Sequence, residues 1–269
     1  MSVRNFEMAI AQRRERFEML VPEHISDKKA YLSRLAFECD MLIKENSRLA
    51  SCEPKSLMLG AMEAARHRLH FSQGECSLIP FKSRGGYSAV FVLGVTGIIR
   101  ILYRTGVVNK VKYGAVMEND VFDFGEGSGD NDFILHKKAL KNRGGIVAAW
   151  ASVQMKDGTT HIYVMDQDEL FKIRDSSPGY RASDDSSPYN KWPEEMYGKA
   201  PLKRLFKRLQ FDPEGNGEVK SAINALDADM MVRADVDSEP EFFEGAADET
   251  VAINPGTGEV VESAVGDAA

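Results

Sequence analysis

The chain has 269 residues, of which 43% are hydrophobic, and a formal net charge of −7. A chain of this length and composition can bury the core of one large domain or two small ones. Its apolar runs fall far short of the roughly 20 residues that a membrane-spanning helix needs, and its three cysteines are widely spaced, without a CxxC pair. These features argue against a membrane protein, a disulfide-stapled secreted domain and a zinc site, and they predict a cytoplasmic protein.

The charge is divided unevenly along the chain. Residues 213–269 contain fourteen acidic and two basic residues, about −12, whereas the first 212 residues contain 32 basic and 27 acidic residues, about +5. A basic body is typical of a protein that binds a polyanion, and an acidic tail either keeps such a body soluble or contacts a partner. We therefore predict a folded body over residues 1–212 and a disordered acidic tail over 213–269, in which Phe242 and Phe243 form an acidic–aromatic motif.

The first part of the body is predicted to be helical. Apolar residues recur at helical spacing before Pro22, over residues 26–43, and again from Pro54 to about His70. These stripes include no candidate catalytic residue, so they serve packing within a subunit or assembly between subunits. We expect residues 1–50 to contribute to oligomerisation.

Strand signals begin at Cys76 and alternate with helical segments. The predicted strands are Cys76–Phe81, Tyr87–Leu93, Val107–Val116, Val121–Phe124, and the hairpin of Ile146–Met155 with Thr159–Met165. A short helix precedes Gly106, and Asp166 is a candidate N-cap for another helix. The pattern predicts an α+β fold, with a small antiparallel sheet and hairpin flanked by helices.

The segment from Pro201 to Gln210 gives the sharpest functional signal. Helical spacing places four apolar residues in one arc and four cations opposite them: Leu202, Leu205, Phe206 and Leu209 against Lys203, Arg204, Lys207 and Arg208. Four cations without an intervening acid repel one another unless an anion lies beside them, which favours a phosphate backbone over a merely solvated helix face. Pro201 removes one helical hydrogen bond and predicts a kink or a restart of the helix there.

A series of short motifs runs from about Leu57 to Gln210. They are SLIPF at Ser77–Phe81, GVTGIIRILYRTG at Gly94–Gly106, V–x3–D–x–F at Val116, Asp120 and Phe122, His136, the Gly144–Trp150 strand, KDG at Lys156–Gly158, MDQDELFKIRDSS at Met165–Ser177, and SPYNKWPEEMYGKAPLKRLFKRLQ at Ser187–Gln210. In order and spacing this series resembles the RecT family of phage and prophage single-strand annealing proteins, distant relatives of Red beta. The chain departs from the family pattern at Lys199-Ala200, where the family has Lys-Thr, and at Leu209-Gln210, where it has Leu-Pro.

The resemblance implies a Red beta/RecT-like annealing core that binds single-stranded DNA and pairs it with a complementary strand in homologous recombination. It implies that the protein assembles with itself into a ring or helical filament that holds the annealed duplex. It also implies a partner exonuclease that makes the single strand, and it implies no binding to a membrane. ATP is not expected, in agreement with the absence of a GxxxxGK loop. No other cofactor is expected, with Mg²⁺ at most modulating annealing.

Annealing requires no catalytic residue, so the candidate site consists of cations and aromatic rings. The predicted DNA contacts are Arg100, Arg104, Lys110, Lys112, Lys137, Lys138, Lys141, Arg143, Lys199, Lys203, Arg204, Lys207 and Arg208. The candidate rings for base stacking are Tyr87, Tyr103, Tyr113 and Trp192, each of which has a core role as its alternative.

Two alternatives stay open. The first is a module that protects single-stranded DNA without annealing it, which sequence barely separates from an annealing protein. The second is a Mg²⁺-dependent nuclease, disfavoured because its candidate carboxylates lie in a glycine-rich segment without a matching lysine or histidine framework. Those carboxylates are Asp120, Asp123, Glu126, Asp130 and Asp132.

Overall fold

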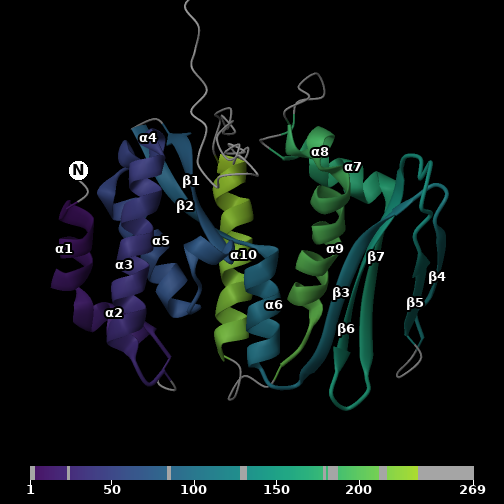
Figure 1. Cartoon of the computed structure of the whole chain (residues 1–269), viewed down its shortest axis with the longest axis horizontal. Coiled ribbons are helices and arrows are strands. Elements are labelled where there is room, and N and C mark those ends of the chain that lie inside the picture. Colours follow the sequence, from purple (N-terminus) through teal and green to yellow (C-terminus); the bar gives the residue numbers. More distant parts are fainter. Residues whose placement is uncertain are drawn as a thin grey trace, which may run out of the picture.

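The structure, a computed structural model, describes residues 4–22, 25–83, 86–127, 132–177, 180, 187–211 and 217–235. Helices form its N-terminal part (Figure 1): α1 (Arg4–Gln12), α2 (Arg14–Leu20), α3 (Lys28–Glu45), α4 (Ser47–Ala50) and α5 (Pro54–Arg66), then the 3-10 turn η1 (Phe71–Gln73). Helix α1 packs against α3, and α2 packs against α3 and α5, so Ile10, Phe17 and Val21 are buried. The apolar stripes of α1 and α2 therefore serve the core of the subunit itself.

A hairpin follows these helices. Strands β1 (Cys76–Ser83) and β2 (Gly86–Leu93) pair antiparallel, with Cys76 opposite Leu93. Helix α5 packs against β2, and so does α10 (Gly217–Asp235), which also contacts α6 (Val95–Arg104). The hairpin is thus the shared support of elements that are far apart in the sequence.

The largest sheet has three antiparallel strands in the order β3-β6-β7. They are β3 (Val108–Met117), β6 (Ile146–Met155) and β7 (Thr160–Asp166), and β6 and β7 are the predicted hairpin. Helix α9 (Pro193–Arg208), which follows α8 (Pro188–Lys191), packs against all three strands, and α7 (Gln167–Asp175) contacts β6 and β7. Asp166 caps α7 as predicted, because its side chain accepts a hydrogen bond from the backbone N–H of Glu169 at 2.8 Å.

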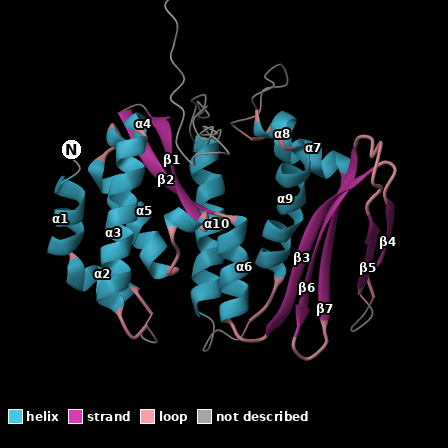
Figure 2. Cartoon of the chain, viewed as in Figure 1, coloured by secondary structure: helices cyan, strands magenta, loops and turns pink. Residues whose placement is uncertain are grey.

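A second, two-stranded sheet consists of β4 (Val121–Gly125) and β5 (Phe133–Lys137). It lies beyond the three-stranded sheet as seen from α9, which gives this part of the molecule three layers (Figure 2). The sequence predicted β4 but not β5, because a strand of five residues behind a glycine-rich segment gives little signal. The α+β fold, with small antiparallel sheets and a hairpin flanked by helices, is confirmed.

Two elements differ from the sequence-based expectations. Helix α9 continues through Pro201 as one helix, without a restart. Helix α10 lies within the segment expected to be a disordered tail, and it buries Val219, Ala222 and Leu226, so the ordered body extends beyond residue 212. Spacings of three and four residues between these side chains form a narrow apolar stripe, which the acidic composition of the segment conceals. Phe242 and Phe243 lie outside the described residues.

The described helices are all too short or too polar to cross a bilayer. Cys39, Cys52 and Cys76 are free, buried thiols, as the sequence predicted.

Candidate nucleic-acid interface

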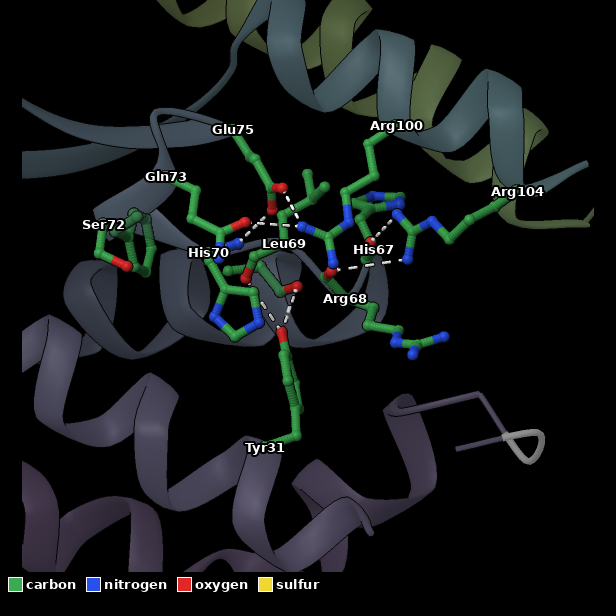
Figure 3. A network of polar contacts seen from close by, with 12 residues as sticks. Tyr31, His67, Arg68, Leu69, His70, Ser72, Gln73, Glu75, Arg100 and Arg104 are labelled. Carbon is green, nitrogen blue, oxygen red and sulfur yellow. Dashed lines mark hydrogen bonds and ion pairs between the residues drawn. The ribbon is translucent and has the colours of Figure 1, made fainter. Parts of the chain in front are cut away.

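The two arginines of α6 bind the segment that joins α5 to β1 (Figure 3). Arg100 donates a hydrogen bond to Oε1 of Gln73 at 2.8 Å and forms an ion pair with Glu75. Helix α6 lies this close because Gly97 has no side chain: a Cβ there would collide with the carbonyl oxygen of Glu75. Gly97 and Arg100 of the GVTGIIRILYRTG motif therefore contribute to the same contact, that of α6 with Glu75.

Arg104 is more enclosed than Arg100. It donates to the carbonyl oxygen of His67 at 2.7 Å and lies 3.0 Å from Oε1 of Glu218 in α10, with 18% of its side chain exposed. Burial lowers the pKa of Arg104, Glu218 opposes that shift, and the nearby Arg100 and Arg68 add to it. In this arrangement both α6 arginines are engaged within the chain.

The segment bound by these arginines is also held by hydrogen bonds to α3. The hydroxyl of Tyr31 donates to the carbonyl oxygens of Ala64 (3.0 Å) and Leu69 (3.1 Å), which fixes the end of α5 (Figure 3). The buried Glu38 accepts hydrogen bonds from the backbone N–H of Phe71 (2.9 Å) and the hydroxyl of Ser72 (2.7 Å). Burial alone would raise the pKa of Glu38, but the hydrogen bonds from Ser72, Arg34 and Phe71, together with the nearby His70, lower it.

The lysines of β3 lie on the far side of the sheet from α9. Strand alternation puts Lys110, Lys112 and Gly114 on one face and Val111 and Tyr113 on the other. Val111 and Tyr113 pack against the core on the face that α9 covers. Lys110 and Lys112, both exposed, thus point away from α9, toward the side where β4 and β5 lie.

A buried polar network ties that second sheet to the first. Asp120, whose side chain is 0% exposed, accepts hydrogen bonds from Nε of Arg143 (3.0 Å), Nε2 of His136 (3.0 Å) and the backbone N–H groups of Met117 (3.1 Å) and Ala139 (2.8 Å). Arg143 and these other donors hold the pKa of Asp120 far below its usual range, against the effect of burial.

His136 connects this carboxylate to β6. Nε1 of Trp150 can only donate, and it lies 2.9 Å from Nδ1 of His136. Nδ1 is therefore the acceptor, and Nε2 carries the proton that His136 donates to Asp120. The V–x3–D–x–F motif and His136, which the sequence pattern singled out, thus have a structural role.

The segment from Lys137 to Arg143 meets the start of α9. Lys138 lies 3.4 Å from Glu194, which also forms an ion pair with Arg143. Lys137 and Lys141 are exposed. Arg143 itself is largely enclosed by Asp120 and Glu194, with 19% of its side chain exposed.

Helix α9 has the amphipathic form that its sequence predicted. Leu202, Leu205, Phe206 and Leu209 are buried. Arg204 and Arg208 are exposed, and Lys199, Lys203 and Lys207 are half-buried. The guanidinium of Arg208 lies 4.3 Å from the centre of the Tyr163 ring on β7. Of these cations, Arg204 and Arg208 are thus the most exposed, and Arg208 also contacts the sheet.

Of the four candidate stacking rings, two are exposed. Trp192, 59% exposed, precedes the first turn of α9, and the side chain of Lys191 lies 5.8 Å from its ring centre. Tyr103 is also exposed, and its hydroxyl accepts a hydrogen bond from the backbone N–H of Val111 at 3.3 Å. Tyr87 and Tyr113 are half-buried against the core.

The predicted cations thus fall into three groups. The α6 pair lies against the α5–β1 segment, the β3 pair lies on the far face of the sheet, and residues 137–143 join α9 through Glu194. The sequence did not indicate Glu194 or Glu218 as partners of these cations, because each contact joins segments far apart in the chain.

The structure gives no support to a metal-dependent nuclease within the part of the chain that it describes. Among those residues, no group of three His, Cys, Asp or Glu side chains could hold a metal ion. The Asp120 carboxylate already accepts hydrogen bonds from Arg143 and His136. Asp123 and Glu126 are exposed, and Asp130 lies outside the described residues.

Comparison with known proteins adds independent information. The model of the RecT family matches residues 34–241. The chain is also similar to Protein RecT of Escherichia coli (strain K12), at 23% identity over 202 residues, which covers 73% of this chain and 71% of that protein. The matched region includes α9, the residue 137–143 segment and the whole of α10.

Proposed function

We propose, because this chain belongs to the RecT family, that it binds single-stranded DNA and anneals complementary strands without ATP. Membership of this family associates the chain with single-strand annealing in recombination. The observation that carries the finer proposal is the join between α9 and residues 137–143. At this join an exposed tryptophan and exposed lysines lie beside the first turn of α9, and the exposed Arg204 and Arg208 follow toward the other end of that helix.

This surface suits a phosphate backbone for a simple electrostatic reason. Two DNA strands repel each other through their phosphates. Base stacking offsets that repulsion only after the first base pairs have formed. Cations along α9 lower the repulsion, and an exposed ring such as Trp192 offers a stacking surface that tolerates any base. In this proposal Arg204, Arg208 and Lys141 contact phosphates directly, whereas Arg143 holds the residue 137–143 segment in place.

Annealing is tested with the purified full-length protein and two complementary single strands, without nucleotide. We expect pairing much faster than in a protein-free control, and no further acceleration on adding ATP. The measurement is stopped-flow fluorescence with a donor and an acceptor dye on the two strands. Dependence on a nucleoside triphosphate, or pairing no faster than the control, would contradict the proposal. Tight binding without faster pairing would indicate a strand-protecting module instead.

We further propose that the protein works in the cytoplasm as an oligomer, beside an exonuclease that supplies the single strand. One subunit presents only a short cationic surface, and adjacent subunits would multiply its contacts through effective concentration. The N-terminal helices expose large apolar side chains that their own packing leaves in water, notably Met19 (86% exposed) and Phe37 (64% exposed). Such side chains are candidates for contact between copies of the chain.

Changing Met19 and Phe37 together to glutamate is expected to shift the protein toward smaller species and to slow annealing. The core should stay intact because both side chains are exposed. Light scattering with and without DNA measures the first effect, and circular dichroism checks the fold. The control is Lys156→Glu, an exposed polar position in the turn between β6 and β7, at the other end of the molecule (Figure 1). An unchanged mass distribution in the double variant would place the contacts between subunits elsewhere.

A further inference from the structure

The sheet of β4 and β5 turns one face toward the three-stranded sheet and the other face away from it. Cross-strand partners lie on the same face of a sheet. His136, the partner of Phe122, accepts a hydrogen bond from Nε1 of Trp150 on β6, so their face is the inner one. The pairs on the outer face are Val121 with Lys137, Asp123 with Leu135, and Gly125 with Phe133.

This outer β4–β5 face exposes large apolar side chains. The exposed fraction is 58% for Val121, 48% for Phe133 and 44% for Leu135. The ring of Phe133 lies across Gly125, where a Cβ would collide with it, so the glycine leaves room for the ring on this face. A single exposed apolar residue is ordinary, but three neighbours on one sheet face are typical of a surface that another protein covers.

The charge of the outer β4–β5 face argues against a nucleic acid as its partner. Residues 113–136 contain six acidic residues and no lysine or arginine. Asp123 lies on the outer face itself, Glu126 is exposed directly after β4, and Lys137 lies at the opposite end of the face. Such a surface repels phosphates, whereas a cationic protein surface with apolar side chains is complementary to it.

The N-terminal helices of this chain present a surface of that kind. Met19 on α2 and Phe37 on α3 are exposed apolar side chains. One helical turn before each of them lies an exposed arginine, Arg16 before Met19 and Arg34 before Phe37. Arg34 pairs with the buried Glu38, and 52% of its side chain is still exposed. These two apolar side chains and two arginines are called the helical surface below.

The charge around Met19 is positive on balance. Residues 13–16 have the sequence RRER. Arg13 and Arg16 are exposed, as is Glu15. The next acid along α2, Glu18, is paired with Arg14 at 2.7 Å. The helical surface therefore complements the outer β4–β5 face both in its apolar side chains and in its charge.

The two surfaces lie toward opposite ends of the molecule (Figure 1). The outer β4–β5 face therefore cannot meet the helical surface of its own copy, but it can meet that of a second copy. Because every copy carries both surfaces, such a contact repeats from copy to copy. Repeated contacts between unlike surfaces close into a ring or continue as a helical filament.

We propose that the outer β4–β5 face of one copy binds the helical surface of the next copy, with apolar side chains meeting apolar side chains and acids meeting arginines. This inference rests on the proposed assembly into an oligomer. It adds the second surface of the contact between subunits and its head-to-tail direction. Helix α9 belongs to neither surface, so the contact leaves Arg204 and Arg208 uncovered.

Mixing two full-length variants tests the contact and its direction. The sheet variant is Phe133→Glu with Leu135→Glu, and the helix variant is Met19→Glu with Phe37→Glu. We expect each variant alone to shift toward the mass of a single chain. Mixed one to one, they should form pairs with the mass of two chains and stop there, because each supplies the surface that the other lacks. Light scattering coupled to size-exclusion chromatography measures these masses.

Two further variants control for folding and for the chemistry of the substitutions. Val107→Glu is the matched control and should assemble like the wild type, because Val107 is an exposed apolar residue (45%) just before β3 and belongs to neither surface. Asp123→Lys keeps every apolar side chain of the sheet. It should weaken assembly by repelling the arginines of the helical surface, and added salt should reduce this effect. Circular dichroism checks that each variant is folded.

The outcomes separate this inference from the proposed function. If the wild type assembles and the folded sheet variant keeps its mass, the inference is wrong and the oligomer and annealing proposals stand. If both variants lose assembly but do not pair when mixed, like surfaces meet like surfaces, which also overturns the inference. A wild type that anneals strands as a single chain would remove the inference and the oligomer together. If the wild type assembles and the variants pair as expected but strands are not annealed, the proposed function falls and this inference stands.

Discussion

Replacing Lys203 and Arg204 together with alanine is expected to flatten the salt dependence of single-strand binding by about 1.4 units. Each neutralised phosphate contributes about 0.7 to the slope of log affinity against log salt for single strands. Arg204 is exposed and Lys203 half-buried on the side of α9 away from its apolar contacts, so the fold should be unaffected. At physiological salt, losing these two phosphate contacts is expected to weaken binding of the single strand about tenfold.

Fluorescence anisotropy of a labelled strand, titrated at several salt concentrations, measures this slope. Lys29→Ala with Lys44→Ala is the control, because it also removes two positive charges, here from two exposed lysines of α3. A second double variant, Lys110→Ala with Lys112→Ala, tests the opposite face of the sheet. If that pair flattens the slope and the α9 pair leaves it unchanged, the strand runs over the face that carries β4 and β5.

The sequence was most informative where a property is local. The amphipathic form of α9 follows from residues three and four positions apart, and the burial of Leu202 and Phe206 confirms it. The β6–β7 hairpin likewise follows from two adjacent strand signals and the turn between them. Such features need no knowledge of the rest of the chain.

The candidate site was harder to predict, because the use of a cation depends on its spatial neighbours. Arg100, Arg104 and Arg143 resemble the exposed cations in sequence, yet each forms an ion pair with an acid from another element. Glu218 reaches Arg104 from a helix that composition predicted to be absent.

Asp120 shows how a motif can be recognised and still be misassigned. Its spacing to Val116 and Phe122 is part of the family pattern, and its charge suggested a metal ligand in the nuclease alternative. The four donors around it come from β3, β5 and the connection after β5. Nothing in a linear pattern indicates that these donors converge on one carboxylate.

Asp120→Ala is expected to destabilise the protein by about 3–5 kcal/mol, the range found when one member of a buried ion pair is removed. For a folded unit of this size that corresponds to a fall in Tm of about 6–20 °C. Arg143 would keep Glu194 as a partner, but His136 would lose its acceptor and the backbone N–H of Ala139 would be left without one. Thermal unfolding followed by circular dichroism measures the change. Asp123→Ala on β4 is the control, because that carboxylate is exposed and should change Tm by little.

The same variant should show a characteristic pH dependence. Because the pKa of Asp120 is lowered in the folded protein, chiefly by Arg143, its contribution to stability is fully present above the ordinary aspartate pKa of about 3.9 and is lost as pH falls through the lowered value. The difference in Tm between wild type and Asp120→Ala should therefore be constant above about pH 5 and narrow below about pH 4. A difference that stays constant to pH 2 would show that shape, not charge, accounts for the loss.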